Sequence, residues 1–232
     1  MLDQELIQIA GVLDDAEASM LQQCGIKYIG FPLRLPVHRE DLSEEEAARI
    51  IQSLDSSVHG VLITYLEDPA EILQLSLALG VRIVQLHGVI HPNQLMEIKR
   101  LAPDLTVVKS LVVGFHDESV LRSMIKELEK SVDAFITDTF DPETGAAGAT
   151  GKTHDWKVSR RLVEASERPV ILAGGLTPQN VRRAILEVRP AGVDCHTGVE
   201  DASGRKSRDR VEAFISEARA GFRELHKKGT GS

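Results

Sequence analysis

Short runs of strand-forming residues alternate with longer amphipathic segments along almost the whole chain of 232 residues. Eight of these runs are dominated by valine, isoleucine, leucine and similar residues. We predict strands at residues 6–10, 28–33, 60–66, 81–86, 106–113, 134–139, 170–173 and 193–196. A segment with helical periodicity follows each run, and repeated β–α units predict a parallel sheet. Eight such units favour closure into a (β/α)8, or TIM, barrel.

An open doubly wound sheet is the main structural alternative. Such sheets usually have fewer strands and place a glycine-rich phosphate turn in the first β–α unit. Here the glycine-rich turns follow the sixth, seventh and eighth predicted strands. No linker or change of composition divides the sequence, so we expect one barrel domain over residues 1–228 and a tail at residues 229–232.

Several predicted helices carry start signals. Asp14 or Asp15 can open the first helix, and Ser43 and Glu46 have the spacing of a capping box. Thr177-Pro178 is expected to cap the helix after the seventh strand.

The charge balance argues against large anionic partners. The chain has a net charge of −8, which gives no electrostatic reason to bind nucleic acid or an anionic membrane. No apolar run approaches the ~20 residues that span a bilayer, and the first ten residues lack a basic leader. Two cysteines, Cys24 and Cys195, do not form a disulfide pattern. We therefore expect a cytoplasmic protein.

In a barrel of this type, the loops that follow the strands form the active face. Gly174-Gly175 ends the seventh strand, and Thr197-Gly198 follows the eighth. Glycines let backbone N–H groups approach an anion closely, and the following helix start adds positive potential. Each pair alone could simply make a tight turn. Both together, at the usual phosphate site of the fold, predict that the protein binds a phosphorylated small molecule.

Three other strand ends carry polar side chains. Asp138 follows an apolar run, where a carboxylate is costly to bury unless it is used, and it could act as a general acid or base. Lys109 is a second candidate, with pairing to an interior acid such as Asp194 as the alternative. His87 and His91 are four residues apart, but a hydrogen-bonded loop histidine is favoured over a metal ligand there. We predict no metal.

A glycine- and alanine-rich segment follows the sixth strand. Residues 145–153 read GAAGATGKT, which invites a nucleotide-binding interpretation. A P-loop needs glycine at the position of Ala146, so the pattern fails. We interpret residues 140–153 as a flexible lid over the barrel mouth, with a plain surface loop as the alternative.

Four short segments carry a family resemblance. They are residues 84–88 (VQLHG), 138–139 (DT), 151–156 (GKTHDW), and the run from 174–176 (GGL) through 193–194 (VD) to 198–200 (GVE). In these segments the chain resembles the phosphoribosylanthranilate isomerases of tryptophan biosynthesis, over nearly its whole length. The resemblance implies a (β/α)8 barrel that converts an aminoaldose phosphate into an aminoketose phosphate, as a monomer or homodimer and with no metal or organic cofactor.

The resemblance also implies roles for individual residues. Asp138 would be the general acid that protonates the ring oxygen of the sugar. The turns at Gly174-Gly175 and Thr197-Gly198 would bind the phosphate. Independently of the resemblance, the positions of His87 and Lys109 at predicted strand ends make both candidates for substrate binding. An arginine after the second strand usually holds the anthranilate carboxylate. Arg39 is the candidate here, and Arg34 is the alternative.

The chain departs from the family pattern at the general base. The family has a cysteine at the end of the first strand, where this sequence reads Gln8-Ile9-Ala10-Gly11, and alanine cannot take a proton. Cys24 lies late in a helix, and Cys195 should point away from the barrel interior because side chains alternate along a strand. His196, where the family tends to have a small serine-like residue, is the best replacement.

Three functions remain open from the sequence. The first is the family's isomerisation with a base that has moved, to His196 or, as a second choice, to His38. The second is another phosphosugar enzyme, such as an aldolase, epimerase or lyase, that uses Asp138 and His196. The third is a phosphometabolite-binding protein without activity, against which the acid at Asp138 counts.

Overall fold

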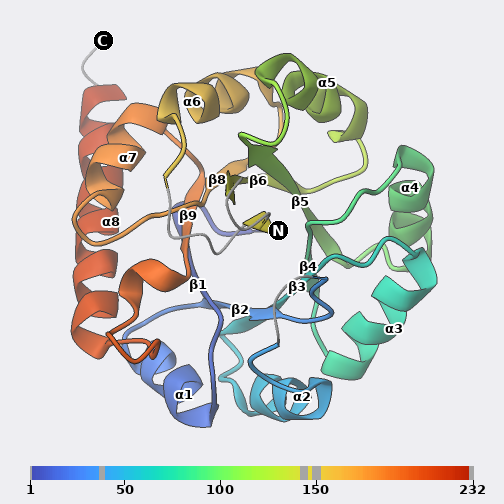
Figure 1. The fold of residues 1–232 in the computed structure, drawn as a ribbon, viewed down its shortest axis with the longest axis horizontal. Helices are drawn as coiled ribbons and strands as arrows, with labels where there is room; N and C mark the ends of the chain where they lie inside the picture. The colour runs from blue at the N-terminus through green and yellow to red at the C-terminus, as the bar shows by residue number, and fades with distance from the viewer. Residues whose placement is uncertain (1, 37–39, 142–145, 148–152, 230–232) are drawn as a thin grey trace.

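The predicted barrel is confirmed in the computed structural model (Figure 1). The structure describes residues 2–36, 40–141, 146–147 and 153–229, with the backbone alone for 140–141, 146–147 and 228–229. The barrel strands are β1 (Leu6–Ala10), β2 (Tyr28–Pro32), β3 (His59–Thr64), β4 (Ile83–Leu86), β5 (Thr106–Val113), β6 (Ala134–Asp141), β8 (Val170–Leu172) and β9 (Gly192–Cys195). All neighbouring pairs are parallel, and β1 pairs with both β2 and β9, which closes the sheet.

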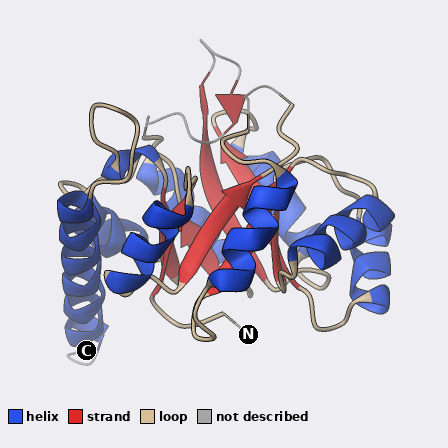
Figure 2. Cartoon of the chain, turned by 90° about the horizontal axis from the view of Figure 1, so that it is seen from below, coloured by secondary structure: helices blue, strands red, loops and turns tan. Residues whose placement is uncertain are grey.

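Helices surround the strands on all sides (Figures 1 and 2). They are α1 (Asp15–Gln23), α2 (Glu44–Ser53), α3 (Pro69–Leu79), α4 (Pro92–Leu101), α5 (Glu118–Leu128), α6 (Trp156–Ala165), α7 (Val181–Val188) and α8 (Arg208–Gly229), with a short 3-10 helix η1 (Thr197–Val199). None of the helices in the described part of the chain is long and apolar enough to cross a membrane.

The cap signals read from the sequence are mostly correct. Asp14 is the N-cap of α1, and Ser43 and Glu46 form the predicted capping box of α2. The expectation for Thr177-Pro178 is wrong, because α7 begins only at Val181. Asn180 takes the cap position instead, and its side chain accepts from the Thr177 N–H at 2.8 Å and donates to the Gly175 carbonyl at 3.0 Å. These bonds hold residues 175–180 as a separate turn.

The segment after β6 is also more ordered at its start than a plain loop. β6 continues to Asp141 and pairs in antiparallel fashion with a two-residue strand, β7 (Ala146–Ala147). The rest of the predicted lid, residues 142–145 and 148–152, lies outside the described residues.

Two apolar clusters stabilise the barrel. The larger one fills the space between strands and helices and includes Ile9, Leu172 and Phe214. The smaller one fills the barrel interior and includes Leu6 and Ala10. Alternate residues of one strand thus belong to different clusters, as the pleat of a strand requires. This alternation decides which polar side chains face the interior.

The capping box gives a direct test of the local folding of α2. We expect Ser43→Ala to lower the free energy of unfolding by about 1 kcal/mol, because the Glu46 N–H at the helix start loses its acceptor. Urea denaturation measures the change. Ser56→Ala, in the exposed turn after α2, is the matched control. An equal effect of both substitutions would contradict the capping role.

Candidate active site

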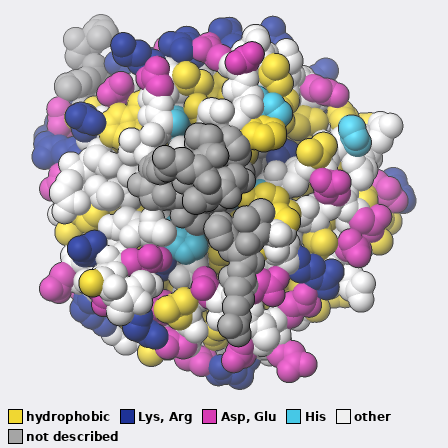
Figure 3. All heavy atoms as spheres, viewed as in Figure 1, with side chains coloured by type: hydrophobic (Ala, Val, Ile, Leu, Met, Phe, Trp, Pro, Cys, Tyr) yellow, Lys and Arg dark blue, Asp and Glu magenta, His cyan; other side chains and the backbone are white. Residues whose placement is uncertain are grey.

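The polar side chains that face the barrel interior gather towards the ends of the strands. Gln8 pairs in register with Asp194, and His196 directly follows the pair of Ile9 and Cys195. His196 therefore comes level with Ala10, which ends β1. Figure 3 shows one face of the molecule, with histidine side chains near its centre and charges of both signs around the rim.

Asp138 is the buried acid of this face. It is 7% exposed and shares the interior-facing side of β6 with Ala134 and Ile136. One carboxylate oxygen accepts from the Thr139 N–H at 2.7 Å. Burial raises the pKa of Asp138 to about 7, the Thr139 bond opposes the rise, and nearby Asp194 adds to it. A carboxyl with this pKa can both donate and accept a proton near neutral pH.

His87, predicted as a hydrogen-bonded histidine and a candidate for substrate binding, lies beside Asp138. Its Nε2 atom is 3.9 Å from the Asp138 Oδ2 atom, and its ring stacks on Tyr65 with 5.1 Å between centroids. Burial and the neighbouring Lys109 lower the pKa of His87 to about 3. The imidazole is therefore neutral at physiological pH. Burial and Asp138 together raise the pKa of Tyr65 to about 12.

Lys109 is held by the main chain. It lies in the middle of β5, not at its end, so that part of the sequence expectation is wrong. It shares its side of the strand with Val107 and Leu111, which pack in the outer cluster. Its Nζ atom donates to the carbonyls of Leu86 at 3.1 Å and Ser110 at 3.0 Å, and burial lowers its pKa to about 8. In the described part of the chain no ion pair joins it to an acid, and a role in substrate binding stays a prediction.

The turn at Gly174-Gly175 needs glycine for two separate reasons. Both residues have positive φ angles, +97° and +61°, which side chains disfavour. A Cβ atom on Gly174 would also collide with the Thr139 hydroxyl. That hydroxyl is bonded to Nδ1 of the partly buried His154 at 2.8 Å, so the hydroxyl cannot move away freely.

The turn after β9 is packed against the turn after β8. A Cβ atom on Gly198 would collide with the Leu176 carbonyl, which also accepts a hydrogen bond from the Cys195 thiol at 3.1 Å. Thr197 begins η1 beside it. The structure therefore brings together the two glycine turns that the sequence singled out. Cys195 belongs to the outer cluster and is not a base for the interior, as alternation predicted.

The place of a base at the end of β1 is taken by an imidazole from the next strand. Ala10 is 2% exposed and has no polar atom in its side chain. A Cβ atom on Gly11 would collide with the His196 ring, so this ring lies directly over Gly11. His196 Nε2 is 3.7 Å from Glu200 Oε1. The buried Lys206 fixes the loop, with Nζ 2.6 Å from the same Glu200 oxygen and 3.1 Å from the His196 carbonyl.

The loop after β2 carries the two arginines considered for the substrate carboxylate. Arg34 has a positive φ of 54°, and its guanidinium bonds Glu44 through Nε at 2.7 Å. It is therefore committed to an acid at the start of α2. Arg39 and His38 lie outside the described residues.

Four polar residues of this region were not identified from the sequence as site residues. Gln8 and Gln85 join inside the barrel, with the Gln8 amide N–H donating to Gln85 Oε1 at 3.1 Å. Thr139 and Asn180 brace the turn at Gly174-Gly175. The interior orientation of the two glutamines could have been read from strand alternation.

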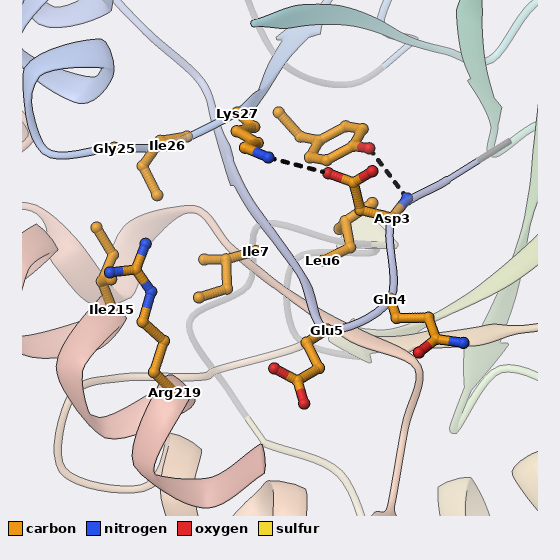
Figure 4. A pocket seen from close by; sticks show the side chains of 11 residues that line it. Asp3, Gln4, Glu5, Leu6, Ile7, Gly25, Ile26, Lys27, Ile215 and Arg219 are labelled. Atoms are coloured by element: carbon orange, nitrogen blue, oxygen red, sulfur yellow. Dashed lines mark hydrogen bonds and ion pairs between the residues drawn. The ribbon is translucent and has the colours of Figure 1, made fainter. Parts of the chain in front are cut away.

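A separate pocket of about 170 Å³ lies at the opposite end of the barrel, at the start of β1 and β2 (Figure 4). Two of its charged groups pair with each other. Lys27 Nζ lies 3.5 Å from Asp3 Oδ2, and the Asp3 N–H donates to the Tyr28 hydroxyl at 3.1 Å. Because barrel active sites lie at the other face, we assign no function to it. Among the described residues no group of three or more histidine, cysteine or acidic side chains could hold a metal ion.

Fold and site together define a (β/α)8-barrel protein with a buried acid near paired glycine turns at the ends of its strands. Comparison with known families agrees. The family model for N-(5'-phosphoribosyl)anthranilate (PRA) isomerase matches residues 5–217, and the chain belongs to this family.

Individual relatives support the assignment. The chain is 36% identical over 218 residues to N-(5'-phosphoribosyl)anthranilate isomerase 2 of Methanosarcina mazei, covering 93% of this chain and 95% of the relative. It is 34% identical to the enzyme of Haloferax volcanii, with 92% of each chain covered.

Solved structures of the family have the same fold. A phosphoribosyl anthranilate isomerase in complex with reduced 1-(o-carboxyphenylamino)-1-deoxyribulose 5-phosphate superposes with a TM-score of 0.76 at 28% identity, covering 93% of this chain and 99% of that one. The dimeric enzyme of Thermotoga maritima, in a form converted to monomers, gives 0.77 at 29% identity with the same coverage.

The raised pKa of Asp138 predicts how stability depends on pH. An unfolded aspartate releases its proton near 3.8, whereas Asp138 holds its proton up to about 7. The native state binds more protons between these values, so the contribution of Asp138 to stability falls as the pH rises through them. Asparagine cannot ionise. We expect Asp138→Asn to be more stable than the wild type at about pH 8 and to lose this advantage at about pH 4.5.

Thermal unfolding at both pH values measures this difference. Asp104→Asn, on an exposed acid, serves as the control and should show no such pH dependence. If Asp138→Asn changed the melting temperature by the same amount at both pH values, the pKa of Asp138 would not be raised by folding, and the prediction would be contradicted.

Proposed function

We propose that the protein is an aldose–ketose isomerase acting on a phosphorylated aminosugar of the phosphoribosylanthranilate type, with Asp138 as general acid and His196 as general base. The observation that carries the proposal is Asp138, a carboxyl that faces the barrel mouth and keeps its proton up to a pKa of about 7. Ring opening needs such a protonated acid at neutral pH, since the ring oxygen must gain a proton as its bond to C1 breaks.

The base must remove the proton from C2 after the ring has opened. Ala10 cannot do this, and His196 supports the role because its ring lies over Gly11, level with Ala10. As the ring opens, the nitrogen lone pair forms a C1=N bond. Loss of the C2 proton then turns the C2–H electron pair into a C1=C2 bond while the C1=N π pair returns to nitrogen, and the resulting enaminol tautomerises to the aminoketone. General acid–base groups of this kind typically contribute about 10²- to 10⁴-fold to the rate.

The phosphate is expected at the two glycine turns. A Cβ atom on Gly174 or Gly198 would collide with neighbouring atoms, and Gly175 has a positive φ that side chains disfavour. Backbone N–H groups in such turns bind anions without competition from side-chain atoms. For the carboxylate of the aromatic half, Arg39 remains the proposed partner, because Arg34 is bound to Glu44.

Turnover separates this function from the alternatives. We expect the purified protein to convert phosphoribosylanthranilate and its gene to rescue a tryptophan auxotroph that lacks the isomerase. Asp138→Asn should abolish activity, and His196→Gln should lower kcat by about 10²-fold or more, since the acid or the base is lost. His226→Gln, on an exposed histidine of α8, is the matched control.

The family arrangement can be rebuilt as a second arm of this experiment. Loss of the His196 imidazole is expected to lower activity, and a cysteine at position 10 is the candidate to restore it. Because the His196 ring covers the end of β1, we expect Ala10→Cys to restore activity only when it is combined with His196→Ser. Phosphate binding without turnover would overturn the proposal in favour of another phosphosugar reaction or a binding protein. Full activity of His196→Gln would exclude His196 as the base.

Phosphate binding itself can be tested without turnover. We expect millimolar inorganic phosphate to raise the melting temperature, because a ligand of the native state stabilises it. Gly175→Asp should remove the shift, because the new carboxylate repels the anion and its side chain strains a backbone with a positive φ. Gly80→Asp is the matched control, since Gly80 has a similar positive φ of +72° at the end of α3 and no atom within 4 Å of a new Cβ. A shift that survives Gly175→Asp would place the phosphate elsewhere.

A further inference from the structure

A chain of side-chain amides crosses the barrel interior and ends on His87. Gln8 on β1 donates from Nε2 to Gln85 Oε1 on β4 at 3.1 Å. The Gln85 Nε2 atom then lies 2.8 Å from His87 Nε2. At the other end, Gln8 pairs in register with Asp194, and its amide lowers the pKa of that carboxyl against the stronger effect of burial. The glutamines and Asp194 are at most 8% exposed, so water does not compete freely for these bonds.

The direction of these bonds fixes the proton on His87. Gln85 uses its oxygen as the acceptor for Gln8, so its NH2 group faces the imidazole and donates to Nε2. A nitrogen that accepts a hydrogen bond carries no proton, and the proton of the neutral ring must then be on Nδ1. In the described part of the chain Nδ1 has no hydrogen-bond partner, so Gln85 alone decides the tautomer.

Protonation of His87 at Nε2 would place two N–H groups against each other. The Gln85 amide would have to turn over, and its NH2 would then face the NH2 of Gln8. The chain therefore resists an imidazolium at this position. The charged and titratable groups around the ring are Asp138 at 3.9 Å, the stacked Tyr65, and Lys109, whose positive charge also opposes protonation.

We propose that Gln85, braced by Gln8, is a positioning residue that keeps His87 neutral and so reserves the acidic proton for Asp138. An imidazolium 3.9 Å from the carboxyl would favour the carboxylate, because an opposite charge stabilises the ionised form of an acid. Asp138 would then lack its proton at neutral pH. The inference rests on the proposed function of Asp138 as the general acid. The lowered pKa of His87 and the raised pKa of Asp138 agree with it.

The tautomer is measured directly by 15N NMR of the histidine side chains, with His87→Gln identifying the signal. We expect the wild-type His87 to show a pyrrole-like Nδ1 and a pyridine-like Nε2 that do not change between about pH 5 and 8. In Gln85→Glu, a carboxylate replaces the NH2 donor, and both nitrogens should become pyrrole-like at neutral pH. Gln52→Glu adds the same charge on an exposed part of α2 and should leave the spectrum unchanged.

Activity gives the second readout. We expect Gln85→Glu to lower kcat at neutral pH by roughly 10-fold or more with little change in KM, and to move the activity optimum to lower pH, as the acid now loses its proton earlier. If Gln85→Glu does not fold, Gln8→Leu removes the brace and should let His87 protonate at a higher pH than in the wild type.

Two results would overturn the inference: a wild-type His87 with its proton on Nε2, or a neutral His87 in folded Gln85→Glu. These results are independent of whether the protein is an isomerase. A wild type without turnover overturns the isomerase, whereas the nitrogen spectra still decide the direction of the amide chain.

Discussion

The pairing of β1 with β9 is the contact on which the site depends. It closes the parallel sheet, and its register sets Gln8 beside Asp194 and brings His196 level with Ala10. These residues come from opposite ends of the chain. A shift of β9 by one residue against β1 would turn the side chains of β9 that face the interior, such as Asp194, outwards. Closure therefore does more than complete the core. It decides which polar groups meet inside the barrel.

The sequence predicted the strands because the pattern of β-type runs is determined locally. It also located Asp138 and the glycine turns, since strand ends and glycines can be recognised without tertiary contacts. The start of α7 was misjudged because the Asn180 side chain bonds the Thr177 N–H and the Gly175 carbonyl, which keeps this stretch out of the helix. The contact between Gln8 and Gln85 could not be predicted, because it joins β1 and β4, which are not neighbours in the sheet.

The end of β1 carries Ala10, and the imidazole of His196, from the loop after β9, lies beside it. This imidazole needs space above the end of β1. Gly11 provides that space, since any side chain there would collide with the His196 ring. Lys206 stabilises this loop, because its Nζ atom donates to the His196 carbonyl and forms a 2.6 Å ion pair with Glu200. The position of the His196 ring is thus determined by its own loop and by the absence of a side chain at Gly11.

The interior of the barrel contains few charges, and this has a consequence for the acid. Burial penalises ionised groups, so Asp138 and Asp194 keep their protons up to a pKa of about 7, and His87 stays neutral. Lys109 is accommodated by main-chain carbonyls at the side of the strand that faces the helices. An ionic partner in place of Gln8 or Gln85 would stabilise a charge on one of the carboxyls. Because Gln8 and Gln85 are neutral, they add no charge that would favour ionisation of Asp138, although His87 Nδ1 and Asp194 Oδ1 have no hydrogen-bond partner among the described residues.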